Sequence, residues 1–307
     1  MLRRRLTAAA SPMLVRAATT AASAVPGGGS VVSSLLKSTA IFGAANGLGF
    51  GISAATGSHL HLDLIGTGVF AVAAMSMAGG GDVRQRVSAG AIAIWATKLS
   101  SFLFYRALQT RHDGRLTDVL STNSGAFGFW FISFAWGFVV SLPHAIAAGV
   151  PVAGRPTFGR MTDILGLALY AVGLTVESAA DYQKWTFKAD PANRGKFCDA
   201  GVWKISQHPN WFGNFCLWLG IWSLNAPTLV ASSPPGIGWA GRICRLVGGA
   251  LSPLFLFGLF YAQATDTIAH TAKLAEQRYG ADPNFARYAE STPLVVPSLA
   301  SLGRLFR

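Results

Sequence analysis

The stretch that decides the fold runs from Val119 to Gly154 and reads VLSTNSGAFGFWFISFAWGFVVSLPHAIAAGVPVAG. Its 36 residues include no Asp, Glu, Lys or Arg. A helix needs about 20 predominantly apolar residues to cross a bilayer, so this stretch is long enough to enter a membrane as helix. We therefore expect a membrane protein.

The rest of the chain follows the same pattern. Of the 307 residues, 51% are hydrophobic and 12% are charged, whereas a soluble domain has about 25% charged residues. Four further intervals lack all four charged residue types: Ser38–Leu62, Leu64–Gly81, Pro209–Gly241 and Leu246–Thr265. Two more are apolar apart from isolated charges: Val87–Tyr105 with Lys98, and Met161–Ala180 with Asp163 and Glu177. We predict an all-α polytopic membrane protein with about seven transmembrane helices.

The net charge of +12 reflects short basic loops rather than a nucleic-acid-binding face. If seven spans alternate, one side of the membrane receives 13 basic residues, while the other receives six, with five more in the N-terminal arm. The positive-inside rule then directs the side with 13 toward the cytosol, matrix or stroma. Those 13 are Arg106, Arg111, Arg115, Lys184, Lys188, Arg194, Lys196, Lys204, Lys273, Arg278, Arg287, Arg304 and Arg307.

Residues 1–30 differ from the remainder, because they are rich in Arg, Ala, Ser and Thr and no acidic residue precedes Asp63. That composition is typical of an organellar targeting segment, mitochondrial first and plastid second. The alternatives are a basic arm that contacts anionic lipid, and a location in the endoplasmic reticulum. Residues 31–307 are expected to form a single membrane domain.

Small residues and cysteines give two further expectations. Gly43, Gly47 and Gly51 recur every four residues, which predicts a helix face that a neighbouring helix approaches closely. The cysteines, Cys198, Cys216 and Cys244, show neither CxxC spacing nor an even number, so we expect no disulfide framework and no metal site.

The best-equipped place for a polar ligand lies between the fifth and sixth apolar stretches. Glu177 and Asp181 are four residues apart and share a helix face, and Lys184 and Lys188 share another. Charges of both signs and interleaved aromatic residues suit a cofactor with phosphates and a flat ring. The polar C-terminal stretch falls on the same side, where Arg287 and two tyrosines, Tyr279 and Tyr288, can close over such a ligand.

From Trp95 onward the chain resembles the DUF1295 proteins, membrane relatives of the steroid 5-alpha-reductase C-terminal domain. The resemblance covers about residues 95–297 and rests on IWATKLSSFLFYRALQTRHDGRL, VESAADYQKWTFK, GKFCDAGVWKISQHPNWFGN and RYGADPNFARYAESTPLVVP. It implies a seven-helix membrane reductase that binds NADPH and passes hydride to a C=C bond in a lipid or steroid-like, hydrophobic small molecule. By motif, the cofactor-binding residues would be Arg106, Arg115, Glu177, Asp181, Gln183, Lys196, His208, Asn210 and Tyr288.

Three cofactor-side positions depart from the usual family motif, which reads Arg-His-Pro-Asn-Tyr-Phe-Gly-Glu. This chain has Gln207, Trp211 and Asn214 in place of Arg, Tyr and Glu. The loss of a cation together with its counter-charge is consistent with an ion pair replaced by amides. An adapted pocket and a decayed one both fit this exchange.

The catalytic residues are unknown from the sequence, and Tyr105 and Lys98 are the candidate proton donors. Steroid reductases use a Glu and Tyr pair in the N-terminal half, whereas no Glu precedes Glu177 here. Membrane methyltransferases that use S-adenosylmethionine share the topology and a similar His-Pro motif, so methyl transfer is the alternative activity. A non-catalytic subunit of a membrane complex is the third.

Overall fold

The computed structural model describes residues 30–110, 120, 122–268 and 271–306, and these residues form helices and no strands. The expected targeting segment lies outside them, apart from Ser30. Seven helices have 15 or more residues: α2 (Val31–Thr56), α3 (Leu62–Ser76), α4 (Val83–Thr110), α6 (Asn123–Val140), α8 (Met161–Ala189), α9 (Pro209–Leu229) and α10 (Trp239–Ala264). The shorter elements are α7 (Leu142–Ala148), η1 (Pro191–Asn193), η2 (Gly201–Lys204), α11 (Thr271–Tyr279), α12 (Pro283–Ser291), α13 (Leu299–Leu302) and η3 (Gly303–Phe306).

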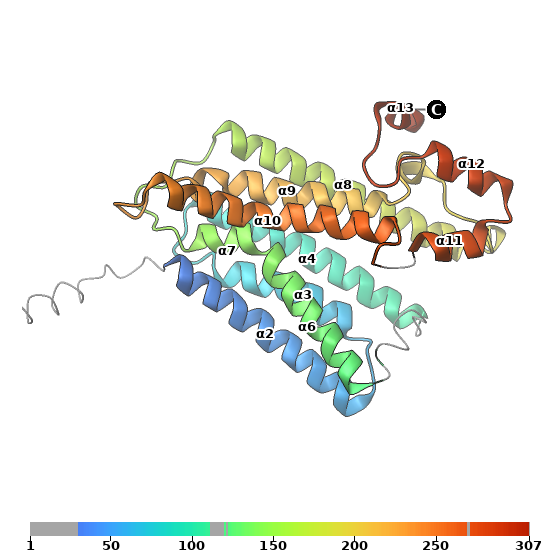
Figure 1. Ribbon diagram of the computed structural model, residues 1–307, viewed down its shortest axis with the longest axis horizontal. Helices are drawn as coiled ribbons and strands as arrows, with labels where there is room; N and C mark the ends of the chain where they lie inside the picture. The colour runs from blue at the N-terminus through green and yellow to red at the C-terminus, as the bar shows by residue number, and fades with distance from the viewer. Residues whose placement is uncertain (1–29, 111–119, 121, 269–270, 307) are drawn as a thin grey trace, which may run out of the picture.

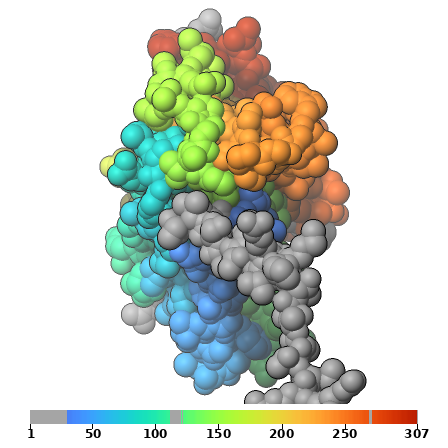
Figure 2. Space-filling model, turned by 90° about the vertical axis from the view of Figure 1, so that its left-hand side faces the viewer, coloured from blue at the N-terminus to red at the C-terminus, as the bar shows by residue number. Residues whose placement is uncertain are grey.

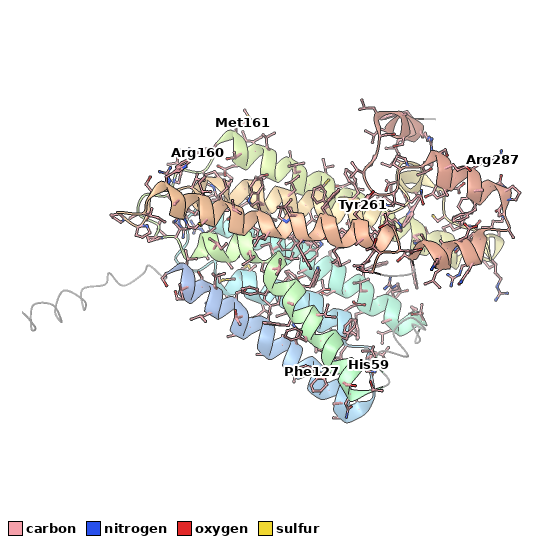
Figure 3. All side chains as sticks on the ribbon, viewed as in Figure 1. His59, Phe127, Arg160, Met161, Tyr261 and Arg287 are labelled. Carbon is pink, nitrogen blue, oxygen red and sulfur yellow. The ribbon has the colours of Figure 1, made fainter. Side chains whose placement is uncertain are left out.

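The long helices form an elongated bundle in which consecutive members run in opposite directions (Figure 1). We call the end that holds the start of α2 the proximal end, and the end that holds α11 to α13 the distal end. Arg160, before α8, marks the proximal end and Arg287, in α12, marks the distal end (Figure 3). The basic side expected from the sequence is thus the distal end.

Four of the described helices are long and apolar enough to cross a membrane: α4, α6, α8 and α10. Helix α3 is apolar but has only 15 residues. The chain is therefore consistent with a multi-pass membrane protein, while the count of seven spans stays a prediction.

Two apolar stretches are divided where the sequence analysis expects one span each. The stretch from Val119 to Gly154 gives α6 and then the short α7, which begins with Leu142 and Pro143. Proline cannot donate the backbone hydrogen bond that a continuous helix requires at that position. Likewise α9 ends at Leu229, and 230–238, which contains two prolines and two glycines, leads to α10.

The centre of the bundle is an aromatic cluster contributed by four helices. Phe42 of α2 contacts Phe70 of α3 with ring centroids 5.0 Å apart. Phe70 contacts Trp95 of α4 at 5.2 Å, and Trp95 contacts Trp218 of α9 at 5.1 Å. All four side chains are fully buried, and edge-to-face pairs of this kind add about 0.5–1.5 kcal/mol each beyond area burial. The cluster holds α4 against α9. Its Trp95 side chain also contacts Glu177, the first of the polar residues described below.

Candidate functional site

Three charged side chains meet between α4 and α8, and we call Lys98, Glu177 and Asp181 the charged trio. Lys98 Nζ lies 3.5 Å from Asp181 Oδ2 and 3.9 Å from Glu177 Oε2. Trp95 Nε1 donates a hydrogen bond of 3.0 Å to Glu177 Oε2. The Glu177 side chain is 4% exposed and that of Asp181 is 17% exposed. As their spacing predicts, the two carboxylates share one face, and there they contact the same lysine.

Two buried polar atoms of α9 near the charged trio have no hydrogen-bond partner among the described residues. These atoms are Asn214 Oδ1 and Trp218 Nε1. Asn214 interacts with Glu177, and Trp218 packs against Trp95. An unpaired buried polar atom costs about 1–3 kcal/mol, and most such atoms in proteins are paired. The unpaired acceptor of Asn214, next to Glu177, and the unpaired donor of Trp218, behind Trp95, therefore suit a ligand that carries both groups, such as a carboxamide.

The trio is held in place by an unusually close approach of α8 and α9 at two pairs of glycines. A Cβ atom on Gly173 would lie 2.5 Å from Gly213 O, and one on Gly213 would lie 2.5 Å from the backbone nitrogen of Glu177. A Cβ atom on Gly166 would lie 2.8 Å from Gly220 O, and one on Gly220 would lie 2.5 Å from Gly166 O. Only glycine allows backbones to touch in this way. The contact sets Glu177 directly against the start of α9.

The first turn of α9 carries a stack of flat rings. The helix begins at Pro209, and the preceding His208 stacks on Trp211 with centroids 4.0 Å apart. Trp211 in turn stacks on Phe260 of α10 at 5.5 Å. Burial, together with the charge of nearby Lys184, lowers the pKa of His208 to about 3. The imidazole is therefore neutral at physiological pH.

Gln207 joins the start of α9 to the C-terminal tail, by which we mean residues 283–306. Its side-chain amide donates to Ala289 O at 2.9 Å and to Thr292 O at 2.8 Å, and its backbone N–H donates to Pro293 O at 2.9 Å. The Gln207 amide, which stands where the usual motif has Arg, therefore donates to carbonyl groups of the same chain. This position ties the tail to the bundle.

Trp203 connects the charged trio to the tail, and the sequence analysis missed it. Its indole N–H donates to Ala180 O at 3.0 Å, next to Asp181, and its carbonyl accepts a 2.8 Å hydrogen bond from the Tyr288 hydroxyl. Lys184 Nζ lies 4.2 Å from the centre of the Trp203 ring. Burial raises the pKa of Tyr288 above its usual range, so this hydroxyl stays protonated as a donor. The aromatic residues that alternate with charged ones in this loop were the sequence signal that could have identified Trp203.

A cavity of about 350 Å³ lies beyond Trp203, under the tail. Three cations line it, namely Lys204, Arg287 and Arg304, against one carboxylate, Asp199. Its other lining residues are Phe197, Asn284, Tyr288, Ser291 and Thr292. The excess of positive charge suits phosphate groups. Of the three residues expected to close over a polar ligand, Arg287 and Tyr288 line this cavity, whereas the Tyr279 hydroxyl accepts a 2.8 Å hydrogen bond from Lys188 Nζ.

The remaining predicted residues are spread around these features. Gln183 accepts a 2.9 Å hydrogen bond from the backbone of Val202 and so supports η2. Arg106 acts electrostatically on Asp181, whereas Lys196 is exposed and its carbonyl accepts from Lys188.

Tyr105 is 51% exposed and contacts Trp185, with ring centroids 5.8 Å apart. Asn210 is half-buried in the first turn of α9. Arg115 lies outside the described residues.

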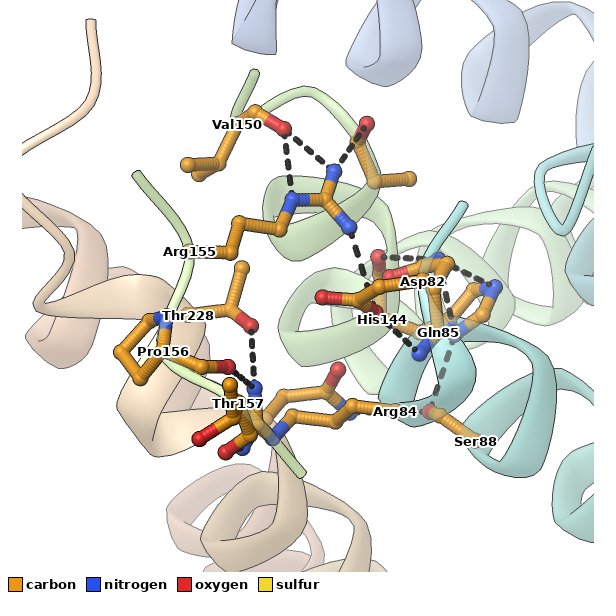
Figure 4. A network of polar contacts seen from close by, with 12 residues as sticks. Asp82, Arg84, Gln85, Ser88, His144, Val150, Arg155, Pro156, Thr157 and Thr228 are labelled. Atoms are coloured by element: carbon orange, nitrogen blue, oxygen red, sulfur yellow. Dashed lines mark hydrogen bonds and ion pairs between the residues drawn. The ribbon is translucent and has the colours of Figure 1, made fainter. Parts of the chain in front are cut away.

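A second polar network, which the sequence analysis missed, lies at the proximal end (Figure 4). Arg84 is 1% exposed, and its Nε and Nη2 donate to the two Asp163 carboxylate oxygens at 2.6 and 2.9 Å. His144, also buried, donates from Nε2 to Ala74 O at 3.1 Å and lies 2.9 Å from Ser88 Oγ. Within the described residues, no three His, Cys, Asp or Glu side chains converge as a metal site would require. The network joins α3, α4, α7 and α8 at this end of the bundle.

Comparison with known proteins gives one extensive match and one short one. The family model described as a protein of unknown function (DUF1295) matches residues 49–292. A probable O-methyltransferase, ustE, of Ustilaginoidea virens is 31% identical over 74 residues, which are 24% of this chain and 26% of that protein. The chain thus matches about a quarter of that relative's length. No solved structure matches the chain significantly.

Proposed function

The chain belongs to the DUF1295 family, and from this premise we propose that it is a membrane-embedded reductase that uses NADPH to reduce a C=C bond in a lipid or steroid-like substrate. The observation that carries the proposal is the charged trio within α4 and α8. Ionisable side chains at membrane depth are costly and mark functional sites by default. Trp95, Asn214 and Trp218 surround the trio with further polar atoms, two of them unpaired.

The residues present fit the cofactor at both of its ends. The cations of the distal cavity suit its phosphates, and the free acceptor of Asn214 and free donor of Trp218 suit its carboxamide. Trp203 lies between these regions, because it bonds to Ala180, next to Asp181, and to Tyr288, which lines the cavity. When bound, NADPH would supply a hydride to one carbon of the double bond.

The second carbon of the double bond requires a proton, and the charged trio can provide it. The trio has one ammonium group and two carboxyl groups. Its net charge is zero when one of the two carboxyl groups is protonated and the other is ionised. A low-dielectric surrounding favours that neutral state, because two neighbouring carboxylates cannot both ionise freely. Of the two candidate donors, Lys98 belongs to this trio, whereas Tyr105 is half-exposed on the outer face of α4.

Methyl transfer is the second candidate, because the short match is to a probable O-methyltransferase. S-adenosylmethionine carries an ammonium and a carboxylate, which Asp181 and Lys98 could bind as counter-charges. In that case Glu177 would take up the proton of the hydroxyl that receives the methyl group. A non-catalytic membrane-complex subunit would use neither ligand.

A melting experiment separates these functions. The detergent-solubilised protein is heated with a thiol-reactive fluorogenic dye, which reports exposure of buried Cys198 and Cys216, in a Cys244→Ser background that removes the exposed thiol. We expect NADPH to stabilise the protein, by about 2.7 kcal/mol at 100 times its dissociation constant. Asp181→Ala should abolish this stabilisation, while the exposed Glu290→Gln should preserve it.

The same experiment has clear contrary outcomes. Stabilisation by S-adenosylmethionine without any by NADPH would replace the reductase by the methyltransferase. No stabilisation by NADPH, NADH or S-adenosylmethionine would favour the non-catalytic subunit. Full NADPH stabilisation of Asp181→Ala would place the cofactor away from the charged trio.

A further inference from the structure

A second cavity, of about 270 Å³, opens at the proximal end, far along the bundle from the charged trio. It is formed by the start of α2, the turn between α3 and α4, and the segment that follows α7. Its lining residues are Ser33, Ser34, Lys37, Ser76, Met77, Gly79, Gly80, Gly81, Gln85, Ala148, Val150, Val152 and Arg155. Figure 2 looks at this end, where the yellow-green segment before α8 lies between the cyan start of α4 and the orange start of α10.

Arg155 is a buried cation that lines this cavity. Its side chain is 3% exposed. Nε donates to Val150 O at 2.9 Å, and Nη2 donates to Val150 O and to Ala148 O (Figure 4). Nη1 has no hydrogen-bond partner among the described residues, and the carboxylate of Asp82 lies 3.6 Å away from it. Nη1 therefore pairs electrostatically with Asp82 but makes no hydrogen bond within the described residues, so it has donor capacity left for a ligand.

A second cation and a helix start add to the positive charge. Lys37 Nζ is anchored at the cavity by a 2.5 Å hydrogen bond to Ser76 O. The first turn of α2 contributes Ser33 and Ser34 to the lining, and helix starts carry partial positive charge. Asp82 offsets only one of the two cations. A ligand with a negative charge is thus the complementary one.

The surroundings of the cavity indicate where that negative charge comes from. It opens at the start of α4, which is long and apolar enough to cross a membrane, and the end of such a span lies at the depth of lipid headgroups. On α2, next to the lining residues, Val32 and Leu36 are 65% and 64% exposed. A phosphate in the cavity could therefore be joined to acyl chains that lie along this apolar face.

We propose that the proximal cavity binds the phosphate group of an anionic phospholipid, held by Arg155 and Lys37, with its acyl chains along Val32 and Leu36 of α2. The bound lipid would join α2 to the turn before α4. Basic pockets between membrane helices bind anionic headgroups by the same physics.

Native mass spectrometry of the detergent-solubilised protein tests this site with three probes: phosphatidate, zwitterionic phosphatidylcholine and inorganic phosphate. Phosphatidate should bind most tightly. Lys37→Gln should weaken that binding about fivefold, which corresponds to about 1 kcal/mol per cation near a membrane surface. Lys37→Arg should keep it. The matched control is Lys188→Gln, because Lys188 also donates to a backbone carbonyl at 2.5 Å but lies at the distal end.

Because Lys37 is exposed, its replacement leaves the fold intact, and unchanged melting behaviour of Lys37→Gln verifies this. Equal affinity for phosphatidylcholine, or no difference between Lys37→Gln and Lys188→Gln, would overturn the proposal. Inorganic phosphate that binds as tightly as phosphatidate would replace the lipid by a free anion. These readouts contain no NADPH, so they succeed or fail independently of the reductase proposal.

Discussion

Replacing Arg84 by methionine is expected to lower the free energy of unfolding by about 3–5 kcal/mol, the usual cost of breaking a buried ion pair. Both Arg84 and Asp163 have side chains that are 1% exposed. The guanidinium also donates to Pro156 O at 2.8 Å and to Thr157 O at 2.9 Å. Methionine fills similar space but leaves the Asp163 carboxylate without its cation, so the cost is that of an uncompensated buried charge.

The control for this prediction lies two residues away on the same helix. Arg86 is exposed, so Arg86→Met should change the melting behaviour little. Adding Asp163→Asn to Arg84→Met should recover part of the loss, because the amide carries no charge yet keeps an oxygen for the backbone N–H groups of Gly159 and Arg160. If Arg84→Met costs no more than Arg86→Met in the thiol-dye experiment, the ion pair does not stabilise the fold.

Replacing Gly173 by alanine is expected to destabilise the protein by about 1–3 kcal/mol, as overpacking of a tight interior does. The added methyl group would lie 2.4 Å from the backbone nitrogen of Leu217 and 2.5 Å from Gly213 O. Both are backbone atoms of α9, which cannot rotate away. The helices must separate, and Glu177, packed against Gly213, moves with them. The NADPH stabilisation should therefore also fall.

Gly51→Ala is the matched control, and it should act with the opposite sign. A Cβ atom on Gly51 meets nothing within 4 Å among the described residues. Alanine is favoured over glycine in a helix by about 0.5–1 kcal/mol, so this variant should be slightly stabilised. Equal melting of Gly173→Ala and the wild-type protein would contradict the close approach of α8 and α9.

The contrast between these glycines corrects the sequence-based expectation for α2. Gly43, Gly47 and Gly51 were expected to admit a neighbouring helix, but a Cβ atom on Gly47 or Gly51 meets no described residue within 4 Å, and one on Gly43 makes an ordinary 3.8 Å contact with Phe134. The residue of α2 that admits a neighbour is Gly49, where a Cβ atom would lie 2.2 Å from the Trp130 ring. Regular spacing shows that residues share a face, but it does not show which face a neighbour covers.

The candidate site was predictable in part. The resemblance led to Glu177, Asp181 and His208, and helix periodicity placed the two carboxylates on one face. Their counter-charge, Lys98, was named as an isolated charge and a candidate proton donor but not as their partner, because the two carboxylates lie on a helix about 80 residues later in the chain. Trp203 lies within the stretch GKFCDAGVWKISQHPNWFGN but was assigned no role there, and Trp218 lies outside the quoted stretches, so only contacts could identify their roles.

The sequence by itself determined which individual segments are apolar and long enough to lie in a bilayer. Transfer of apolar side chains into lipid depends on composition and length, which are local properties. For this reason the helical class and the apolar stretches could be predicted from the sequence. The tertiary structure decided which buried polar groups are paired and which are free. The pairing of Arg84 with Asp163, the close approach of Gly173 to Gly213, and the Asn214 and Trp218 atoms that lack a partner within the described residues depend on helices that meet only in the folded bundle.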